Sequence, residues 1–201
     1  MSGLSFLLGV RTDEFVVLMA DTLFFDHGAL ITSTDDDRGY ALGDRCRLLC
    51  MGEDVKKFGD FVQANCELYR FRNGYEQSPK SAAHWVSKQV RDALRTRDAF
   101  MVESLVGGFD AHESRAYLAT IDTYGGLIDS SPYLFRGFGS RFAYAVMDDL
   151  YRADLTPQQA IEALTACVKA TRKRFMVQLP KFQVLLIDKD GTKRLDDLKF
   201  E

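Results

Sequence analysis

The chain has 201 residues, of which 46% are hydrophobic, enough for one domain over residues 1–201 that buries roughly 70% of its unfolded surface. Its formal net charge of −3 argues against nucleic acid or an anionic membrane as main partner, because a mildly acidic surface attracts neither. No apolar stretch approaches the roughly 18 residues that span a bilayer, and no secretory signal pattern opens the chain, so we expect an intracellular protein.

The first part of the chain alternates short apolar runs with turns. Residues 5–10 and 15–20 flank the polar turn at 11–14 and predict a hairpin of two largely buried strands. The runs at 29–34 and 46–52 are expected to extend this first sheet.

Two helices are predicted next, joined by a short turn. Apolar residues recur at helical spacing over residues 55–69, and Asn73-Gly74 ends this helix. Ser78 and Pro79 provide an N-cap and a first helical residue for a second helix, whose apolar positions continue to Leu94.

The second half repeats the order of strands followed by helices. Residues 102–110 and 115–122 predict the strands of a second sheet, followed by the turn at 124–126 and another short strand. Residues 139–151 predict a third helix. A capping box at Thr156 and Gln159 opens a fourth, and a hairpin over 182–197 closes the chain.

This order of elements indicates an α+β fold. Two mainly antiparallel sheets stacked face to face, with a helix layer on each outer side, form a four-layer αββα sandwich. A helix layer on a single mixed sheet would give a similar order of elements and is the alternative.

No cofactor or metal site is predicted. Cys46 and Cys50 lack a second ligand pair, the three histidines of the chain are scattered, and Cys66 and Cys167 fall within predicted helices, so all four cysteines are interpreted as buried thiols. The acidic run 35–37 lacks the spacing and final glutamate of a calcium loop and is interpreted as solvated.

Four segments carry a resemblance to a known family. "ELYRFRNGYEQSPKSAA", "GGFDAHESRAYLATID", "GFGSRFAYAVMDDLY" and "RFMVQLPKFQVLLIDKDG" resemble the β-type subunits of the 20S proteasome. Within that family, "LYRFRNGYEQSP" and "LPKFQVLLIDKDG" are similar to the non-catalytic subunit type at the fourth β position of the ring. The resemblance implies the N-terminal-nucleophile hydrolase fold, which is also an αββα sandwich.

The resemblance further implies where catalytic groups would stand in an active relative. These are an N-terminal threonine after a glycine, an aspartate ending the second strand and a lysine on a later strand. Asp21 matches the aspartate, but Ser5 stands near the nucleophile position and follows Leu4, with no room for a substantial propeptide. The lysine position falls near Asp37 or Arg38, and an arginine stays protonated and cannot shuttle a proton.

The second-half catalytic set is also replaced. Phe138, Arg174 and Val177 stand where the family has a serine, an aspartate and a second serine. The resemblance therefore implies a non-catalytic structural subunit, in which Asp21 holds a turn. The alternative is an active serine/threonine peptidase. Ser2 is a poor nucleophile for it, since it lies roughly 10 Å before Ser5 along an extended chain and on the opposite strand face.

As partners, the resemblance implies other α and β proteasome subunits in a hetero-oligomer of stacked seven-membered rings, in cytoplasm and nucleus. Leu23, Phe24 and Phe25 follow a strand directly and form one candidate contact; the alternative is that at least one of them folds back into the core. We hypothesise that Phe24 or Phe25 approaches the substrate cleft of an active neighbour. The second candidate, which otherwise packs its own turn, is the group Tyr69, Arg70, Phe71, Arg72 and Tyr75.

Overall fold

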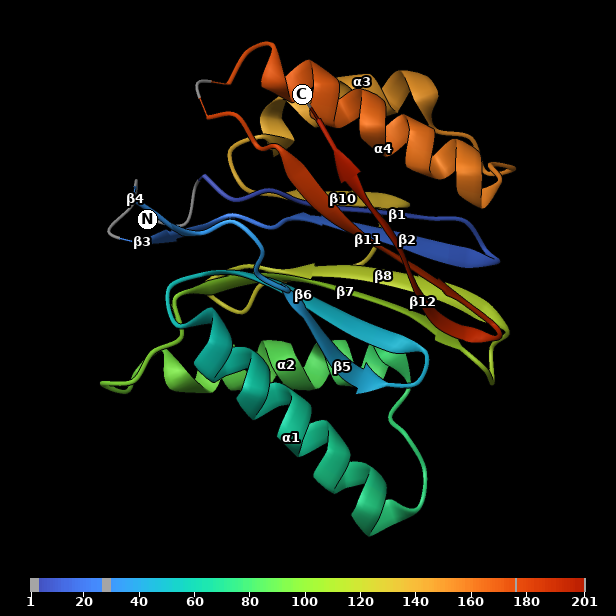
Figure 1. Ribbon diagram of the computed structural model, residues 1–201. Helices are drawn as coiled ribbons and strands as arrows, with labels where there is room; N and C mark the ends of the chain where they lie inside the picture. The colour runs from blue at the N-terminus through green and yellow to red at the C-terminus, as the bar shows by residue number, and fades with distance from the viewer. Residues whose placement is uncertain (1–3, 27–29, 176, 201) are drawn as a thin grey trace.

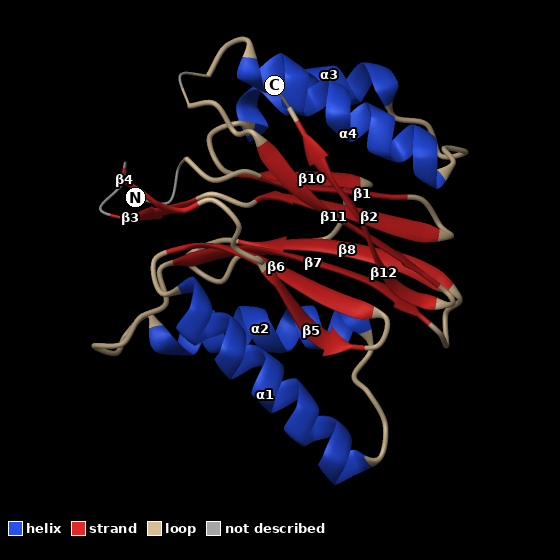
Figure 2. Ribbon diagram, viewed as in Figure 1, coloured by secondary structure: helices blue, strands red, loops and turns tan. Residues whose placement is uncertain are grey.

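The computed structural model describes residues 4–26, 30–175 and 177–200, without the side chains of residues 25 and 26. Two antiparallel sheets lie face to face, and a pair of helices covers the outer face of each (Figures 1 and 2). This four-layer arrangement confirms the predicted αββα sandwich and excludes the single mixed sheet.

The first sheet has the strand order β10-β1-β2-β11-β12, with every neighbouring pair antiparallel. Its strands are β1 (Leu7–Arg11), β2 (Phe15–Asp21), β10 (Tyr133–Arg136), β11 (Lys181–Asp188) and β12 (Gly191–Lys199). The predicted hairpins β1–β2 and β11–β12 are both present, and β11 pairs with β2 in the centre of the sheet.

The second sheet has the order β5-β6-β7-β8-β9, again antiparallel throughout. Its strands are β5 (Gly39–Gly43), β6 (Cys46–Gly52), β7 (Val102–Asp110), β8 (Arg115–Ile121) and β9 (Leu127–Ile128). The expectation that 29–34 and 46–52 extend the first sheet was wrong. β6 pairs with β7, while β4 (Leu30–Ser33) pairs with β3 (Phe24–Asp26) in a separate two-stranded ribbon.

Four helices form the outer layers. α1 (Val55–Asn73) and α2 (Pro79–Ala93) cover the second sheet, and α3 (Ser140–Leu150) and α4 (Pro157–Arg172) cover the first (Figure 2). The predicted caps are present: Gly74 ends α1 with a φ of 77°, and the Ser78 hydroxyl accepts the Ser81 N–H at 3.2 Å. Within the described residues, no helix is both long and apolar enough to cross a membrane.

Side chains alternate between two environments along β1, β2, β10 and β11 of the first sheet. On β1, Leu8 and Val10 face α3 and α4, whereas Leu7 enters the core between the sheets. Two glycines allow the sheets to approach there. A Cβ on Gly9 would lie 2.8 Å from Leu118 Cδ1, and one on Gly107 would lie 2.9 Å from Leu18. The glycines therefore leave the space that these leucines fill.

Candidate functional site

A buried polar cluster lies where β1 begins and β2 ends. It contains Ser5, Asp21, Arg38 and Gln183, each of which is at least nine-tenths buried. These residues come from four distant places in the sequence, and the pairing of β11 with β2 sets Gln183 opposite Ala20, next to Asp21. The cluster occupies the position at which the family resemblance placed a catalytic site.

Asp21 binds the backbone just before the first strand. Its Oδ1 accepts the Phe6 N–H at 2.7 Å, and its Oδ2 lies 3.3 Å from Nη2 of Arg38. Burial raises the pKa of the Asp21 carboxyl above its usual value, while the Arg38 guanidinium and the backbone amides of Phe6 and Leu23 oppose that shift. The Asp21 carboxyl group thus contacts both a backbone donor and a cation.

Arg38 makes hydrogen bonds to several members of the cluster. Its Nε donates to the carbonyl of Asp21 at 2.8 Å, and its Nη2 donates to the Ser5 Oγ at 3.0 Å and to the Leu23 carbonyl. Its backbone N–H donates to Gln183 Oε1 at 3.3 Å. Of the two residues that the resemblance placed near the lysine position, Arg38 lies in the cluster, whereas Asp37 pairs with Arg194.

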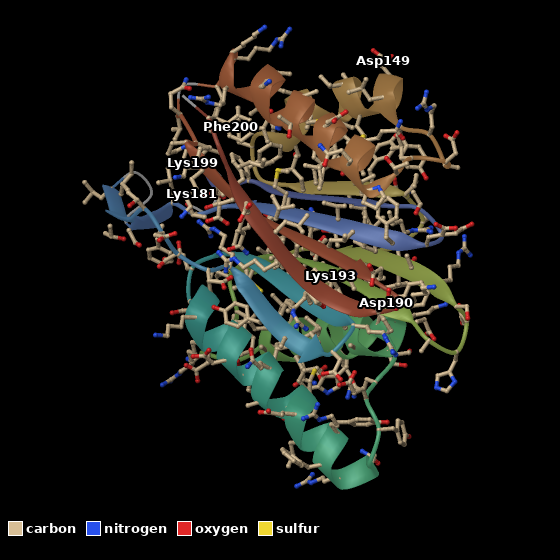
Figure 3. All side chains as sticks on the ribbon, turned by 45° about the vertical axis from the view of Figure 1, so that its right-hand side comes forward. Asp149, Lys181, Asp190, Lys193, Lys199 and Phe200 are labelled. Atoms are coloured by element: carbon tan, nitrogen blue, oxygen red, sulfur yellow. The ribbon has the colours of Figure 1, made fainter. Side chains whose placement is uncertain are left out.

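The acidic run before Arg38 is held by basic residues of the last hairpin. Lys181 lies 2.5 Å from Asp35 and 3.0 Å from Asp197, and Arg194 lies 2.7 Å from Asp37. Figure 3 shows Lys181 and Lys199 at one end of this hairpin and Asp190 and Lys193 at the other. Hydrogen bonding and charge attraction from Lys181 lower the pKa of Asp35. The run is solvated, as predicted, but it is also anchored by ion pairs.

The second-half positions carry no acid or hydroxyl. Phe138 is partly exposed, and its ring stacks on Phe175 with centroids 5.1 Å apart. Arg174 is exposed and donates to the carbonyl of Ala170, and Val177 packs against the core beneath α4. Among the described residues, no hydrogen bond connects these three side chains to the buried cluster.

This geometry limits what the cluster can do chemically. A serine nucleophile needs a neighbouring group that accepts its proton, and in N-terminal nucleophiles the chain's own amine takes part. Here the Ser5 nitrogen is in a peptide bond with Leu4, and the hydrogen bond to Ser5 Oγ comes from a guanidinium, which only donates. The contact therefore positions Ser5 without activating it.

Sequence reasoning missed the role of Gln183. Its carbonyl oxygen accepts the Arg38 N–H, and its Nε2 is a buried amide nitrogen without a hydrogen-bond partner among the described residues. The available signal was a glutamine within the apolar run 182–187, since a buried polar side chain needs partners.

The first predicted contact segment requires a correction. Leu23 is only 2% exposed and packs in the core between the first sheet and its helices, so it cannot belong to an exposed patch. The reason is that Arg38 binds the Leu23 carbonyl and turns the chain inward at this point. Phe24 is half-buried, and the side chain of Phe25 lies outside the described structure, as does all of Ser2.

The turn between α1 and α2 exposes most of the second predicted set. Phe71 and Tyr75 are largely exposed, as are Arg70 and Arg72, while Tyr69 is half-buried. The Tyr69 and Tyr75 rings meet edge to face with centroids 5.8 Å apart, and their hydroxyls are 3.2 Å apart. Two of the aromatics thus pack the turn, and Phe71 projects from it.

The four cysteines are free and buried, as predicted. Burial raises the pKa of Cys66 to about 11 and that of Cys167 to about 12, and raises those of Cys46 and Cys50 as well, so all four are poor nucleophiles. In the part of the chain that the structure describes, no group of three or more His, Cys, Asp or Glu residues could hold a metal ion.

Comparison with known proteins identifies the class. The family model described as "Proteasome subunit" matches residues 5–187, which include both sheets except β12 and the last residue of β11, all four helices and the buried cluster. The chain belongs to the proteasome subunit family, as one of the β-type subunits of the 20S core that degrades proteins.

Three relatives show which types of proteasome β subunit the chain is similar to. The chain is 39% identical to proteasome subunit beta type-2 of Caenorhabditis elegans, over 97% of this chain and 99% of that protein. It is 32% identical to beta type-2-A of Arabidopsis thaliana, over 93% of this chain and 91% of that protein. It is 29% identical to beta type-4 of Saccharomyces cerevisiae, over 96% of this chain and 98% of that protein. The predicted resemblance is confirmed.

Proposed function

We propose that this chain is a non-catalytic, structural β subunit of the 20S proteasome core. It helps form an inner ring and encloses the chamber in which neighbouring subunits degrade proteins. The observation that carries the proposal is the position of Arg38. Its guanidinium binds Ser5, just before β1, and Asp21, the last residue of β2. By the family resemblance, an active relative needs a lysine at this position that can give up a proton, which an arginine cannot.

The replaced second-half positions support the same proposal. An active site would require an acid and hydroxyls near Ser5, and the chain has Phe138, Arg174 and Val177 at the matching positions. Asp21 keeps its place because it accepts the Phe6 N–H and pairs with Arg38, a use that is independent of catalysis.

The proposed partners are the other α and β subunits, in a hetero-oligomer of stacked seven-membered rings located in cytoplasm and nucleus. The family membership supports assembly with other proteasome subunits. Exposed apolar side chains, among them Phe71 and Tyr75, supply surface for it.

The test is native mass spectrometry of the tagged chain purified from its own cells, with ejection of the subunit to read its mass. We expect a particle of proteasome size whose ejected chain retains Ser5 and the residues before it, apart from Met1. We also expect Ser5→Ala to leave every peptide-cleaving activity of the particle unchanged. A chain cut to expose Ser5, a loss of one activity in Ser5→Ala, or a homomeric species would overturn the proposal and reopen the alternative, an active serine/threonine peptidase.

A further inference from the structure

Segment 34–38 is joined to the last hairpin by a row of five charged side chains. In order of contact, they are Asp35, Lys181, Asp197, Arg194 and Asp37. We call this row the ionic strap. Its charges alternate in sign, so each of the three inner members contacts two charges opposite to its own. The strap therefore begins and ends on the segment and passes through the hairpin between.

Asp197 stands at the centre of the strap because β12 contains a bulge. In a regular strand, residues three apart point to opposite faces of the sheet. The register of the β11–β12 pair shifts here, so that residues 196–197 of β12 oppose residue 183 of β11. A bulge re-aims the side chains that it contains. It brings Oδ1 of Asp197 to 3.5 Å from Nη2 of Arg194, which lies three residues earlier.

The charge of Asp197 is needed on both of its sides. Its side chain is only 19% exposed, and its Oδ1 is buried without a hydrogen-bond partner among the described residues, so Arg194 supplies the compensating charge. Its Oδ2 lies 3.0 Å from Nζ of Lys181. Because both cations contact the same carboxylate, loss of its charge would leave two like charges close together, which repel.

The segment that the strap holds has few other ties to the body of the protein. The Asp36 N–H donates to the carbonyl of Thr22 at 3.0 Å, and the Thr22 hydroxyl donates to the carbonyl of Thr34 at 3.0 Å. The segment then ends at Arg38, whose side chain enters the buried cluster. A short, largely exposed segment with few hydrogen bonds opens locally at little cost unless further contacts hold it.

We propose that the ionic strap is a conformational device that keeps segment 34–38 in the position from which Arg38 enters the buried cluster, and that the β12 bulge aims Asp197 into it. Salt screens charges on partly exposed side chains, so the hold of the strap weakens as the ionic strength rises. This inference goes beyond the proposed function, because it requires neither a partner nor a particular catalytic status. It makes the last hairpin responsible for the order of a segment more than 140 residues earlier.

The first test is amide hydrogen exchange of the full-length chain. Asp197→Asn removes the central charge at nearly unchanged size. Asp196→Asn is the matched control, because Asp196 belongs to the same bulge but is exposed and forms no ion pair in the described part of the chain. We expect segment 34–38 to exchange about tenfold faster in Asp197→Asn and within about twofold of the wild type in Asp196→Asn. Equal exchange of this segment in the two variants overturns the inference.

The second test applies salt to the unaltered chain. Raising the salt concentration from 0.1 to 1 M shortens the Debye length from about 10 Å to about 3 Å. We expect exchange in segment 34–38 of the wild type to accelerate at least about threefold, while the buried strand β7 keeps its rate. The acceleration should be smaller in Asp197→Asn, which has already lost the central charge. A segment whose exchange ignores salt in the wild type contradicts the inference.

The salt measurement also decides the case in which Asp197→Asn exchanges faster throughout the chain, since it needs no variant. Neither result bears on the proposed function, which is tested by the mass of the chain in the particle. The two proposals therefore fail independently.

Discussion

Arg38 connects several groups of the buried cluster through one side chain. Its guanidinium donates to the hydroxyl of Ser5, to the carbonyls of Asp21 and Leu23, and pairs with the Asp21 carboxylate. A buried ion pair adds little net stability over apolar packing, yet removing one partner leaves the other charge buried and uncompensated. The cluster is therefore expected to be intolerant of single changes.

At the residue scale, we predict that Arg38→Ala lowers the free energy of unfolding at neutral pH by about 3–5 kcal/mol. The loss of Arg38 removes one of the influences that lower the Asp21 pKa, so that pKa rises further. A carboxyl whose pKa is higher in the folded than in the unfolded chain binds its proton more tightly when folded. The free energy of unfolding therefore falls as the pH rises from the unfolded-state pKa through the folded-state pKa. The loss in free energy of unfolding that Arg38→Ala causes should thus be smaller at about pH 4.5 than at about pH 7.

Urea denaturation at both pH values measures this effect. Arg174→Ala is the matched control, because Arg174 is an exposed arginine whose guanidinium bonds only the Ala170 carbonyl among the described residues. It should change stability by no more than about 0.5 kcal/mol at either pH. An Arg38→Ala protein as stable as Arg174→Ala would contradict the structural role.

At the scale of elements, helix ends are set by local chemistry that the sequence displays. The capping box predicted for α4 is present: the Thr156 Oγ1 accepts the Gln159 N–H at 3.3 Å, and the Gln159 side chain accepts the Thr156 N–H at 3.0 Å. Pro157 occupies the first helical position, where no intrahelical N–H bond is lost. These bonds need no information from distant residues, so the prediction succeeded.

We predict that Thr156→Ala destabilises the chain by about 1 kcal/mol, because an N-terminal N–H of α4 loses its acceptor. The comparison is Gln158→Ala, two residues later, which removes a side chain from the helix surface without touching the cap and should cost less than about 0.5 kcal/mol. Urea denaturation midpoints of the two variants measure the difference. Equal midpoints would show that the cap contributes nothing here.

At the scale of the whole molecule, the two sheets meet through residues far apart in the sequence. Gly107 on β7 faces Leu18 on β2, and Gly9 on β1 faces Leu118 on β8. Glycine within a strand weakens it and often marks the close approach of another element. Here the approach is that of the opposite sheet, which could not be predicted from either strand alone.

We predict that Gly107→Val destabilises the chain by about 1–3 kcal/mol, because the added methyl groups compete with Leu18 for one space in a close-packed core. Leu18→Ala alone should cost about 2–5 kcal/mol by leaving a cavity. The double variant should be more stable than the sum of the two losses implies, since each change relieves the other. Additive losses in thermal or urea unfolding would show that the two residues do not share the space.

The sequence by itself determined the kinds and order of the elements, the helix caps at Ser78 and Thr156, and the family, because these depend on local hydrogen bonds, periodicity and residue identity. Tertiary structure alone decided which sheet each strand joins. β6, expected to extend the first sheet, is largely apolar on both faces and pairs with β7 in the second sheet. Strand pairing is a long-range choice that a strand buried on both faces does not encode locally. The buried cluster was also decided by contacts between segments distant in the chain. The Arg38 side chain lies against Asp21, and the Asp37 side chain pairs with Arg194.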